Sequence, residues 1–178
     1  MNKNLKKISK TLSYLLRHKP QNFGIKLEKK GGWAYTNEVL DAVKITLDEL
    51  QQIVDDNDKN RFKFNEDKSK IRASQGHSLT LGIEIDMEKV VPPFKLYHGT
   101  KKDVLDIIMK EGLKPITRLV HLSPDIETAT AVSDRRKGDN VILEIEARAM
   151  YTDGVDIRLS ENGVYIVEYV DPKYIYVK

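Results

Sequence analysis

The stretch "RFKFNEDKSKIRAS", residues 61–74, predicts a β-hairpin. Residues 61–64 alternate between charged and aromatic side chains, residues 65–69 form a polar turn, and residues 70–74 return as a second strand. In the second strand Ile71 and Ala73 suit a buried face, whereas Arg72 points the other way. We therefore expect a basic two-stranded ribbon with one apolar face.

Two helices are predicted at the start of the chain, ahead of this hairpin. In residues 4–18, "NLKKISKTLSYLLRH", apolar side chains recur at helical spacing, namely at Leu5, Ile8, Leu12, Leu15 and Leu16. Pro20 ends that helix, because proline lacks the N–H that would continue it. Residues 36–43 form a short second helix, with Thr36 or Asn37 as its N-cap.

A third predicted helix covers residues 46–58, "TLDELQQIVDDND". Thr46 and Glu49 have the spacing of a capping box. The expected buried stripe consists of Leu47, Leu50, Ile53 and Val54. Three helices followed by a basic hairpin are the pattern of a winged helix. Many winged helices bind nucleic acid, but a fold by itself does not settle function.

The stretch "VVPPFKLYHGT", residues 90–100, marks a change of pattern. Pro92 and Pro93 interrupt the preceding segment, so we expect two domains, residues 1–92 and 93–178. In the second domain, helices are predicted over residues 101–113 and from Asp125, and strands over residues 119–124, 140–147, 163–170 and 173–178. Asn162-Gly163 is a tight-turn signal. This order predicts an α+β chain with a mainly antiparallel sheet in its second half.

Positive charge is concentrated at the start of the chain. The 178 residues carry a formal net charge of +3, yet residues 1–30 hold nine lysines and arginines against one acid, Glu28, which makes that segment +8. Such a segment suggests a polyanion partner, most simply nucleic acid. It is equally consistent with a solvated, lysine-rich helix face.

Composition argues against several classes of protein. Cysteine is absent, which excludes disulfides, thiolate metal sites and cysteine nucleophiles and fits a cytoplasmic location. No apolar run approaches the length of a membrane span, and no signal peptide is expected. The sequence has no Walker motif, no GxGxxG motif, no carboxylate pair of clear spacing and no nucleophile elbow, which disfavours several common enzyme classes.

Arg17 and His18 end the first predicted helix just before Pro20. A cation near a helix C-terminus is mildly stabilising, so this position has a purely structural explanation. The functional alternative is an anion site, in which arginine offers a planar fork of donors and histidine donates a hydrogen bond or moves a proton.

A dense polar run closes the hairpin in "IRASQGHS", residues 71–78. The structural explanation is a wing with a solvated arginine. The alternative is a second phosphate-binding arginine, Arg72, with further polar groups nearby at Gln75, His77 and Ser78.

Two predicted strands each carry one histidine followed by small or hydroxyl residues, in "YHGT" (97–100) and "VHLSP" (120–124). A single strand histidine is usually structural, but two in one small domain favour a pocket. Gly99 would let a ligand approach the backbone closely. Ser123-Pro124 would open a helix whose N–H groups face a phosphate. A metal site on His98 and His121 lacks a third ligand of suitable spacing.

A last basic stretch is "SDRRKGDN", residues 133–140. It is either a loop that closes a helix, with Gly138 near the C-cap, or the source of a further phosphate-binding arginine.

With these features, the chain resembles the RNA 2′-phosphotransferases of the KptA type. The resemblance covers nearly the whole chain. Its motifs follow the family's order: "SKTLSYLLRHKP", "GGWAYTNEVL", "NDKNRFKF", "IRASQGHS", "LYHGT", "VHLSP", "VILEIEA" and "NGVYIVEYV".

The resemblance implies an N-terminal winged-helix lobe for RNA and a C-terminal lobe akin to ADP-ribosyltransferases that holds NAD⁺. The family removes an internal RNA 2′-phosphate, such as one left at a tRNA splice junction. The phosphate first attacks the anomeric carbon of the nicotinamide ribose, which gives an ADP-ribosylated RNA and free nicotinamide. The ribose 2″-hydroxyl then attacks phosphorus, which releases 2′-OH RNA and ADP-ribose 1″,2″-cyclic phosphate. We expect a monomer that needs no metal.

The resemblance also assigns residues to the phosphate. The family's Arg-His-Arg-Arg set matches Arg17, His18 and Arg72 at its first three positions. For the fourth position, the residue spacing to Gly138 selects Arg136, which we prefer. The residue spacing from Val132 selects Arg135 instead. We hypothesise that the phosphate site is also lined by Gln75, His77 and Ser78.

The motifs around the two strand histidines match the family's NAD⁺-binding strands. The residues concerned are His98, Gly99, Thr100, His121, Leu122 and Ser123. Two alternatives stay open: a transferase that leaves ADP-ribose on phosphorylated nucleic-acid ends, and a non-catalytic RNA-binding winged helix. The intactness of the motifs counts against the second.

Overall fold

The computed structural model describes residues 3–56 and 60–178. Its internal contacts divide the chain into two compact units, Met1–Asp86 and Met87–Lys178, which we describe separately as the first and second unit. Asn57 and Asp58, the last residues of the predicted third helix, lie outside the described residues, as does residue 59. None of the described helices is long and apolar enough to cross a membrane.

The first unit contains the three predicted helices. They are α1 (Lys3–Arg17), α2 (Thr36–Val43) and α3 (Leu47–Asp55), with short 3₁₀ turns at Pro20–Phe23 and Leu79–Leu81. The buried side of α1 carries Leu5, Leu12, Leu15 and Leu16. These leucines pack in one core with residues from α3 and the hairpin, among them Leu50, Ile53, Phe62 and Ile71. Each such side chain contributes roughly 1.5–3 kcal/mol of hydrophobic stabilisation.

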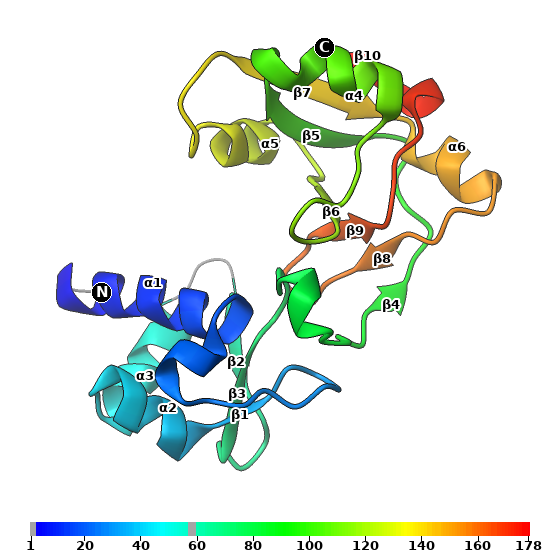
Figure 1. The fold of residues 1–178 in the computed structure, drawn as a ribbon. Coiled ribbons are helices and arrows are strands. Elements are labelled where there is room, and N and C mark those ends of the chain that lie inside the picture. Colours follow the sequence, from blue (N-terminus) through cyan, green and yellow to red (C-terminus); the bar gives the residue numbers. More distant parts are fainter. Residues whose placement is uncertain (1–2, 57–59) are drawn as a thin grey trace. The chain divides into compact units, whose positions relative to one another are not determined.

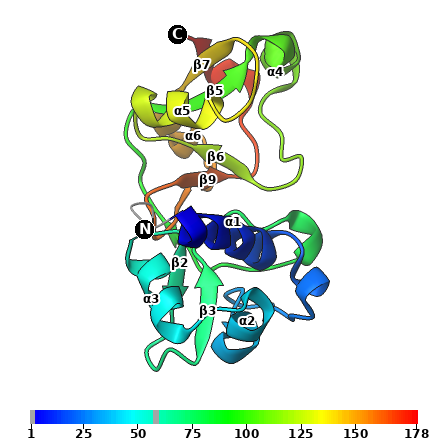
Figure 2. The same cartoon turned by 90° about the vertical axis from the view of Figure 1, so that its left-hand side faces the viewer.

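A three-stranded antiparallel sheet completes the first unit, in the order β1-β3-β2 (Figures 1 and 2). The predicted hairpin is confirmed as β2 (Phe62–Phe64) and β3 (Lys70–Ala73). The short strand β1 (Ala34–Tyr35), which the sequence did not indicate, pairs with the other edge of β3.

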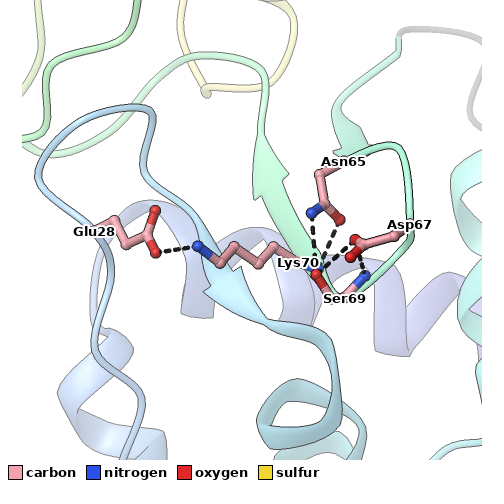
Figure 3. Close-up of polar contacts among 5 residues, drawn as sticks. All are labelled: Glu28, Asn65, Asp67, Ser69 and Lys70. Atoms are coloured by element: carbon pink, nitrogen blue, oxygen red, sulfur yellow. Dashed lines mark hydrogen bonds and ion pairs between the residues drawn. The ribbon is translucent and has the colours of Figure 1, made fainter.

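Side chains rather than a short glycine turn close the hairpin (Figure 3). Asp67 Oδ1 accepts hydrogen bonds from the Ser69 amide (3.0 Å) and hydroxyl (2.6 Å), and Asn65 Oδ1 accepts one from the Lys70 amide at 2.8 Å. Such local bonds are the reason why Asn, Asp and Ser are favoured in turns.

The N-terminal ends of two helices differ in how far they follow the prediction. The capping box of α3 is confirmed, since the Glu49 amide donates to Thr46 Oγ1 at 3.2 Å and the Thr46 amide to Glu49 Oε2 at 2.9 Å. The predicted cap of α2 on Thr36 or Asn37 is wrong: the N-cap residue is Tyr35, and the Thr36 hydroxyl donates instead to the Lys68 carbonyl. Leu47 does not join the buried stripe, because at the first position of α3 it stays 43% exposed.

The second unit is built from two small antiparallel sheets. One has the order β10-β7-β5, with β5 (Leu96–Lys101), β7 (Asn140–Ile145) and β10 (Ile175–Val177). The other has the order β4-β8-β9-β6, with β4 (Glu88–Lys89), β6 (Val120–Leu122), β8 (Arg158–Leu159) and β9 (Tyr165–Val167). A bridge between Tyr97 and Ser123 joins them. The predicted α+β class and antiparallel pairing are therefore confirmed.

Three short helices accompany these sheets: α4 (Leu105–Glu111), α5 (Ile126–Ser133) and α6 (Ala147–Thr152). Two 3₁₀ turns cover Lys102–Val104 and Pro172–Tyr174. Helix α5 lies along β5 and β7, and α4 lies on the other side of that sheet (Figure 1).

The division between the units falls at residues 86/87, ahead of the predicted boundary at 92/93. The reason is that β4 pairs with β8, which ties residues 88–89 to the second unit. Pro92 and Pro93 therefore lie within the second unit, between β4 and β5.

Gly99 has a structural role that the sequence analysis did not anticipate. A Cβ at this position would lie 2.0 Å from the Ala129 carbonyl oxygen and 3.0 Å from Ser133 Cβ. The missing side chain thus lets α5 pack directly against β5. This contact gives Gly99 a structural explanation, and the approach of a ligand to its backbone stays a prediction.

Gly99→Ala should therefore destabilise the second unit strongly. We expect a loss of about 3 kcal/mol or more, because the backbone of α5 must move to admit the methyl group. Gly163→Ala is the matched control, since its methyl group would enter open space and meet only the cost of φ +76, about 1 kcal/mol. Urea unfolding of both variants tests this, and equal losses would contradict the packing argument.

Candidate functional site

In the first unit, the end of α1 is tied to the segment that follows β3. The Ser78 amide donates to the Arg17 carbonyl at 2.8 Å, and the Ser78 hydroxyl is hydrogen-bonded to His18 Nδ1 at 2.9 Å. Ser78 therefore fixes the orientation of the His18 ring. These bonds bring Arg17 and His18 next to the polar run at residues 74–78.

Arg72 is not a solvated wing residue. Although it lies on the opposite face of β3 from Ile71 and Ala73, only 7% of it is exposed. Its guanidinium carbon lies 4.7 Å from the centre of the Trp33 ring, and Nη1 donates to the Gly31 carbonyl at 3.5 Å. Arg17 Nη2 donates to the Arg61 carbonyl, also at 3.5 Å. The structural explanation of Arg72 as a solvent-facing cation is therefore wrong.

His77 lies among these cationic groups and is 9% exposed. Burial above all, and then the neighbouring charges of Arg17, Arg72 and His18, together lower its pKa from 6.5 to about 4. Among the residues that the structure describes, neither ring nitrogen of His77 has a hydrogen-bond partner, and the same is true of Gln75 Oε1. A buried polar group without a partner is expensive, so the site is suited to receive one from a ligand or water.

The sequence-predicted residues of the first unit thus converge. Arg17 and His18 from α1, Arg72 from β3, and the following loop form one cluster, which consists of Arg17, His18, Arg72, Gln75, His77 and Ser78 and which we call the basic cluster. The charges of Arg17, Arg72 and His18 that act on His77 are positive, and His77 itself stays neutral near pH 7. This arrangement suits a multiply charged oxyanion, for which arginine supplies paired donors and a neutral imidazole adds a hydrogen bond without further repulsion.

In the second unit, His98 on β5 is held in one tautomer. Its Nδ1 lies 2.9 Å from the His121 carbonyl oxygen, which can only accept, so Nδ1 carries the hydrogen. Burial lowers the pKa of His98, and the charges of Arg118 and Arg136 lower it as well, while the bond to His121 acts in the opposite direction. The neutral ring therefore presents Nε2 as an acceptor, which suits a ligand hydroxyl.

Arg118 is a candidate that the sequence analysis missed. It is half-buried, burial lowers its pKa, and the charges of Arg136 and Arg135 lower it as well. In the sequence, Arg118 is a lone arginine two residues before β6. No periodic pattern distinguishes it there from an ordinary surface residue. Arg118, Arg136 and His98 form a second group suited to an anion that also carries hydroxyls.

The side chain of a buried lysine, Lys101, holds the loop after α5 in place. Lys101 Nζ donates to the Gly138 carbonyl at 2.9 Å and also to Asn140 Oδ1. Ser133 Oγ donates to the Thr100 carbonyl at 2.8 Å. These bonds hold both ends of the segment that carries Arg135 and Arg136. Of these two arginines only Arg136 acts on His98, which favours it as the member of the group.

The other predicted residues of the second unit have structural explanations. Leu122 is fully buried in the core, and the Ser123 amide and carbonyl pair with Tyr97. A helix does follow Ser123-Pro124, while the approach of a phosphate to its N-terminus stays a prediction. Helix α5 begins at Ile126, and the Asp125 carboxylate caps it by accepting from the Thr128 amide at 2.6 Å.

No group of three or more potential metal ligands occurs within residues 3–56 and 60–178. The two histidines of the second unit instead share the hydrogen bond between the His98 ring and the His121 carbonyl.

Comparison with known proteins gives concordant matches over almost the whole chain. Residues 3–169 match the model of the "RNA 2′-phosphotransferase, Tpt1 / KptA family". Three relatives carry the name "Probable RNA 2′-phosphotransferase". They come from Fusobacterium nucleatum (45% identical, covering 95% of this chain and 96% of the relative), Flavobacterium johnsoniae (46%, 100% and 100%) and Burkholderia pseudomallei (47%, 94% and 92%).

The buried, neutral state of His77 should be visible as a pH dependence of stability. In the unfolded chain its pKa returns to 6.5, whereas in the folded chain it is about 4, so the unfolded state binds the proton first as the pH falls. The free energy of unfolding should thus decrease between pH 6.5 and 4, by about 3 kcal/mol from this residue.

Urea unfolding of the wild type and of His77→Gln between neutral pH and pH 4 measures this contribution, and the variant should show the smaller decrease. An NMR titration gives an independent check. A His77 ring that titrates near 6.5 in the folded protein would contradict the assignment.

Proposed function

We propose, from the premise that this chain belongs to the RNA 2′-phosphotransferase, Tpt1 / KptA family, that it removes an internal 2′-phosphate from RNA and consumes NAD⁺ in the process. Membership of the family makes the chain a transferase. The observation that carries the proposal is the basic cluster, in which two arginines and His18 surround a buried, neutral His77. We propose a tRNA splice junction as a typical source of the substrate RNA.

We assign the RNA 2′-phosphate to the basic cluster. A terminal phosphate carries close to two negative charges at neutral pH. Arg17 and Arg72 would neutralise them through paired N–H donors, and His18, oriented by Ser78, would donate to a third oxygen. Within the described chain, the His77 ring nitrogens and Gln75 Oε1 are buried without a hydrogen-bond partner, which supports a ligand-facing role for them. We also propose that this unit is a winged helix, which its three helices and antiparallel hairpin support.

We assign NAD⁺ to the second unit, as an ADP-ribosyltransferase-like lobe. Its residues fit such a molecule: Arg118 would balance the diphosphate, and the acceptor nitrogen of His98 would receive a ribose hydroxyl. We keep Arg136 as the fourth arginine for the phosphate that is transferred. When bound, NAD⁺ supplies an anomeric carbon with a good leaving group, nicotinamide. Leu122 and Gly99 would support this site through their packing inside the unit and not through contact with the ligand.

In the first proposed step, an oxygen of the RNA phosphate forms a bond to the anomeric carbon, and the bond to nicotinamide breaks. The basic cluster would hold the phosphate oxygens in place for this attack, which is mainly a matter of position. In the second step, the adjacent ribose 2″-hydroxyl releases its proton to solvent, its oxygen attacks phosphorus, and the bond to the RNA 2′-oxygen breaks. Fixed arginines stabilise the charge on the phosphoryl oxygens, and His18 would deliver the proton that the departing 2′-oxygen requires.

The first test uses a short RNA with one internal 2′-phosphate, incubated with the protein and EDTA, with and without NAD⁺. We expect RNA lighter by one phosphate, together with nicotinamide and ADP-ribose cyclic phosphate, only when NAD⁺ is present, because the arginines do the work of a metal. Mass spectrometry of all products decides. Unchanged RNA with a folded, NAD⁺-binding protein would contradict the proposal, and a 5′-phosphorylated strand that gains ADP-ribose would support the end-modifying alternative.

A second test separates the two neighbouring arginines. Arg136→Ala should lower kcat/KM by about 100-fold or more, which is typical for the loss of a group that stabilises transition-state charge. Arg135→Ala, which removes the same charge one residue away, should lower it less than about tenfold, because Arg135 does not act on His98. Arg17→Ala and Arg72→Ala serve as positive controls. A larger loss in the Arg135 variant would reverse the assignment.

A further inference from the structure

Trp33 faces the buried arginine of β3 across a strand pair. In the pairing of β1 with β3, Ala34 lies opposite Ile71 and Tyr35 opposite Lys70, so the same register places Trp33 opposite Arg72. The Arg72 guanidinium carbon lies 4.7 Å from the centre of the indole ring. This is the geometry of a cation–π contact, and at Arg72 it lies in a buried environment, where such contacts are strongest.

The two glycines before Trp33 make room for this contact. A Cβ on Gly31 would lie 2.5 Å from the Trp33 ring nitrogen, and a Cβ on Gly32 would lie 2.8 Å from His77 Nε2. Both glycines have positive φ, +83° and +65°, which other residues rarely adopt. The Gly31 carbonyl also accepts a hydrogen bond from Arg72 Nη1. The segment from Gly31 to Trp33 therefore contacts both the face and one edge of the guanidinium.

A guanidinium on a long flexible side chain loses rotational freedom when it grips an anion. An aromatic ring against its flat face restricts that freedom in advance. The N–H donors project from the edge of the guanidinium, so stacking on the face does not consume them. An arginine held in this way is preorganised for a planar, paired grip on phosphate oxygens.

We propose that Trp33 is a positioning residue, which fixes the plane of the Arg72 guanidinium so that its edge donors meet the substrate phosphate. The expected effect of Trp33 on catalysis rests on the proposed function. The contact between the Trp33 ring and the Arg72 guanidinium does not depend on it.

The same hairpin face offers a matched control. Two residues along, Tyr35 stacks with Lys70, whose ammonium nitrogen lies 5.3 Å from the ring centre. Lys70 is also held by Glu28 and by the turn residues shown in Figure 3. Because Tyr35 is exposed, and Lys70 has no place in the basic cluster, removal of this ring changes a similar contact without touching Arg72.

The experiment compares Trp33→Leu, Trp33→Phe and Tyr35→Leu on RNA with an internal 2′-phosphate. Trp33→Leu should lower kcat/KM about 10- to 30-fold, in line with the loss of a desolvated cation–π contact. Trp33→Phe should recover most of that loss because it keeps a ring, and Tyr35→Leu should stay within about twofold. Equal activity of Trp33→Leu and wild type would overturn the proposal.

A double-mutant cycle of binding affinities shows whether Trp33 acts through Arg72. The affinity for the 2′-phosphorylated RNA, relative to the same RNA with a 2′-hydroxyl, is measured for Trp33→Leu, Arg72→Ala and the double variant. If Trp33 only positions Arg72, the tryptophan substitution has no further effect once Arg72 is removed. Additive losses would mean that Trp33 contacts the RNA or the fold independently, which overturns the positioning role.

One readout does not depend on activity. The Arg72 Nε–H proton should be shifted by the ring current of Trp33 in NMR spectra of the wild type, and this shift should vanish in Trp33→Leu and persist in Tyr35→Leu. If Trp33→Leu does not fold, Trp33→Met replaces it as an apolar variant without a ring. An unshifted Arg72 signal in the wild type would overturn the inference, whereas a shifted signal in a protein without phosphotransferase activity would count against the proposed function alone.

Discussion

The hydrogen bond from the Ser78 amide to the Arg17 carbonyl is the contact on which the first unit's candidate site depends. It occupies a carbonyl that a helix C-terminus would otherwise leave without a partner within the helix. It also fixes the loop after β3 against α1, so that residues far apart in sequence share one environment. The same serine orients the His18 ring through its hydroxyl. One residue thus both completes a helix end and aligns a candidate proton donor.

Both units place arginine charges near a histidine whose pKa is lowered, but they do so in different ways. In the first, Arg72 is buried beside other cations, and His77 remains neutral, because burial and the surrounding positive charge disfavour a further proton. In the second, two arginines lie near His98, whose ring is fixed by the His121 carbonyl. Positive charge gathered in this way attracts an anion, so each group is suited to bind one.

Much of the fold could be predicted because its signals are local. The α1 stripe, the α3 capping box and the hairpin follow from periodicity and turn chemistry within a few residues. By contrast, β1 is only two residues long, and its pairing with β3 depends on tertiary structure. The packing role of Gly99 cannot be predicted, since sequence alone does not show that Ala129 of α5 packs against it. Arg118 was missed because its proximity to His98 arises only when two strands pair.

The candidate site shows the same limit. The arginines at positions 17 and 72 could be identified from family motifs, but their burial, and the neutrality of His77, are properties of packing. The role of Gly31 and Gly32 cannot be predicted either. It becomes visible only in the structure, where the Trp33 indole lies over Arg72. Trp33 is also the only tryptophan in the chain. Its fluorescence therefore comes from a single position, in contact with a candidate phosphate-binding arginine, and gives the molecule a built-in optical probe of that site.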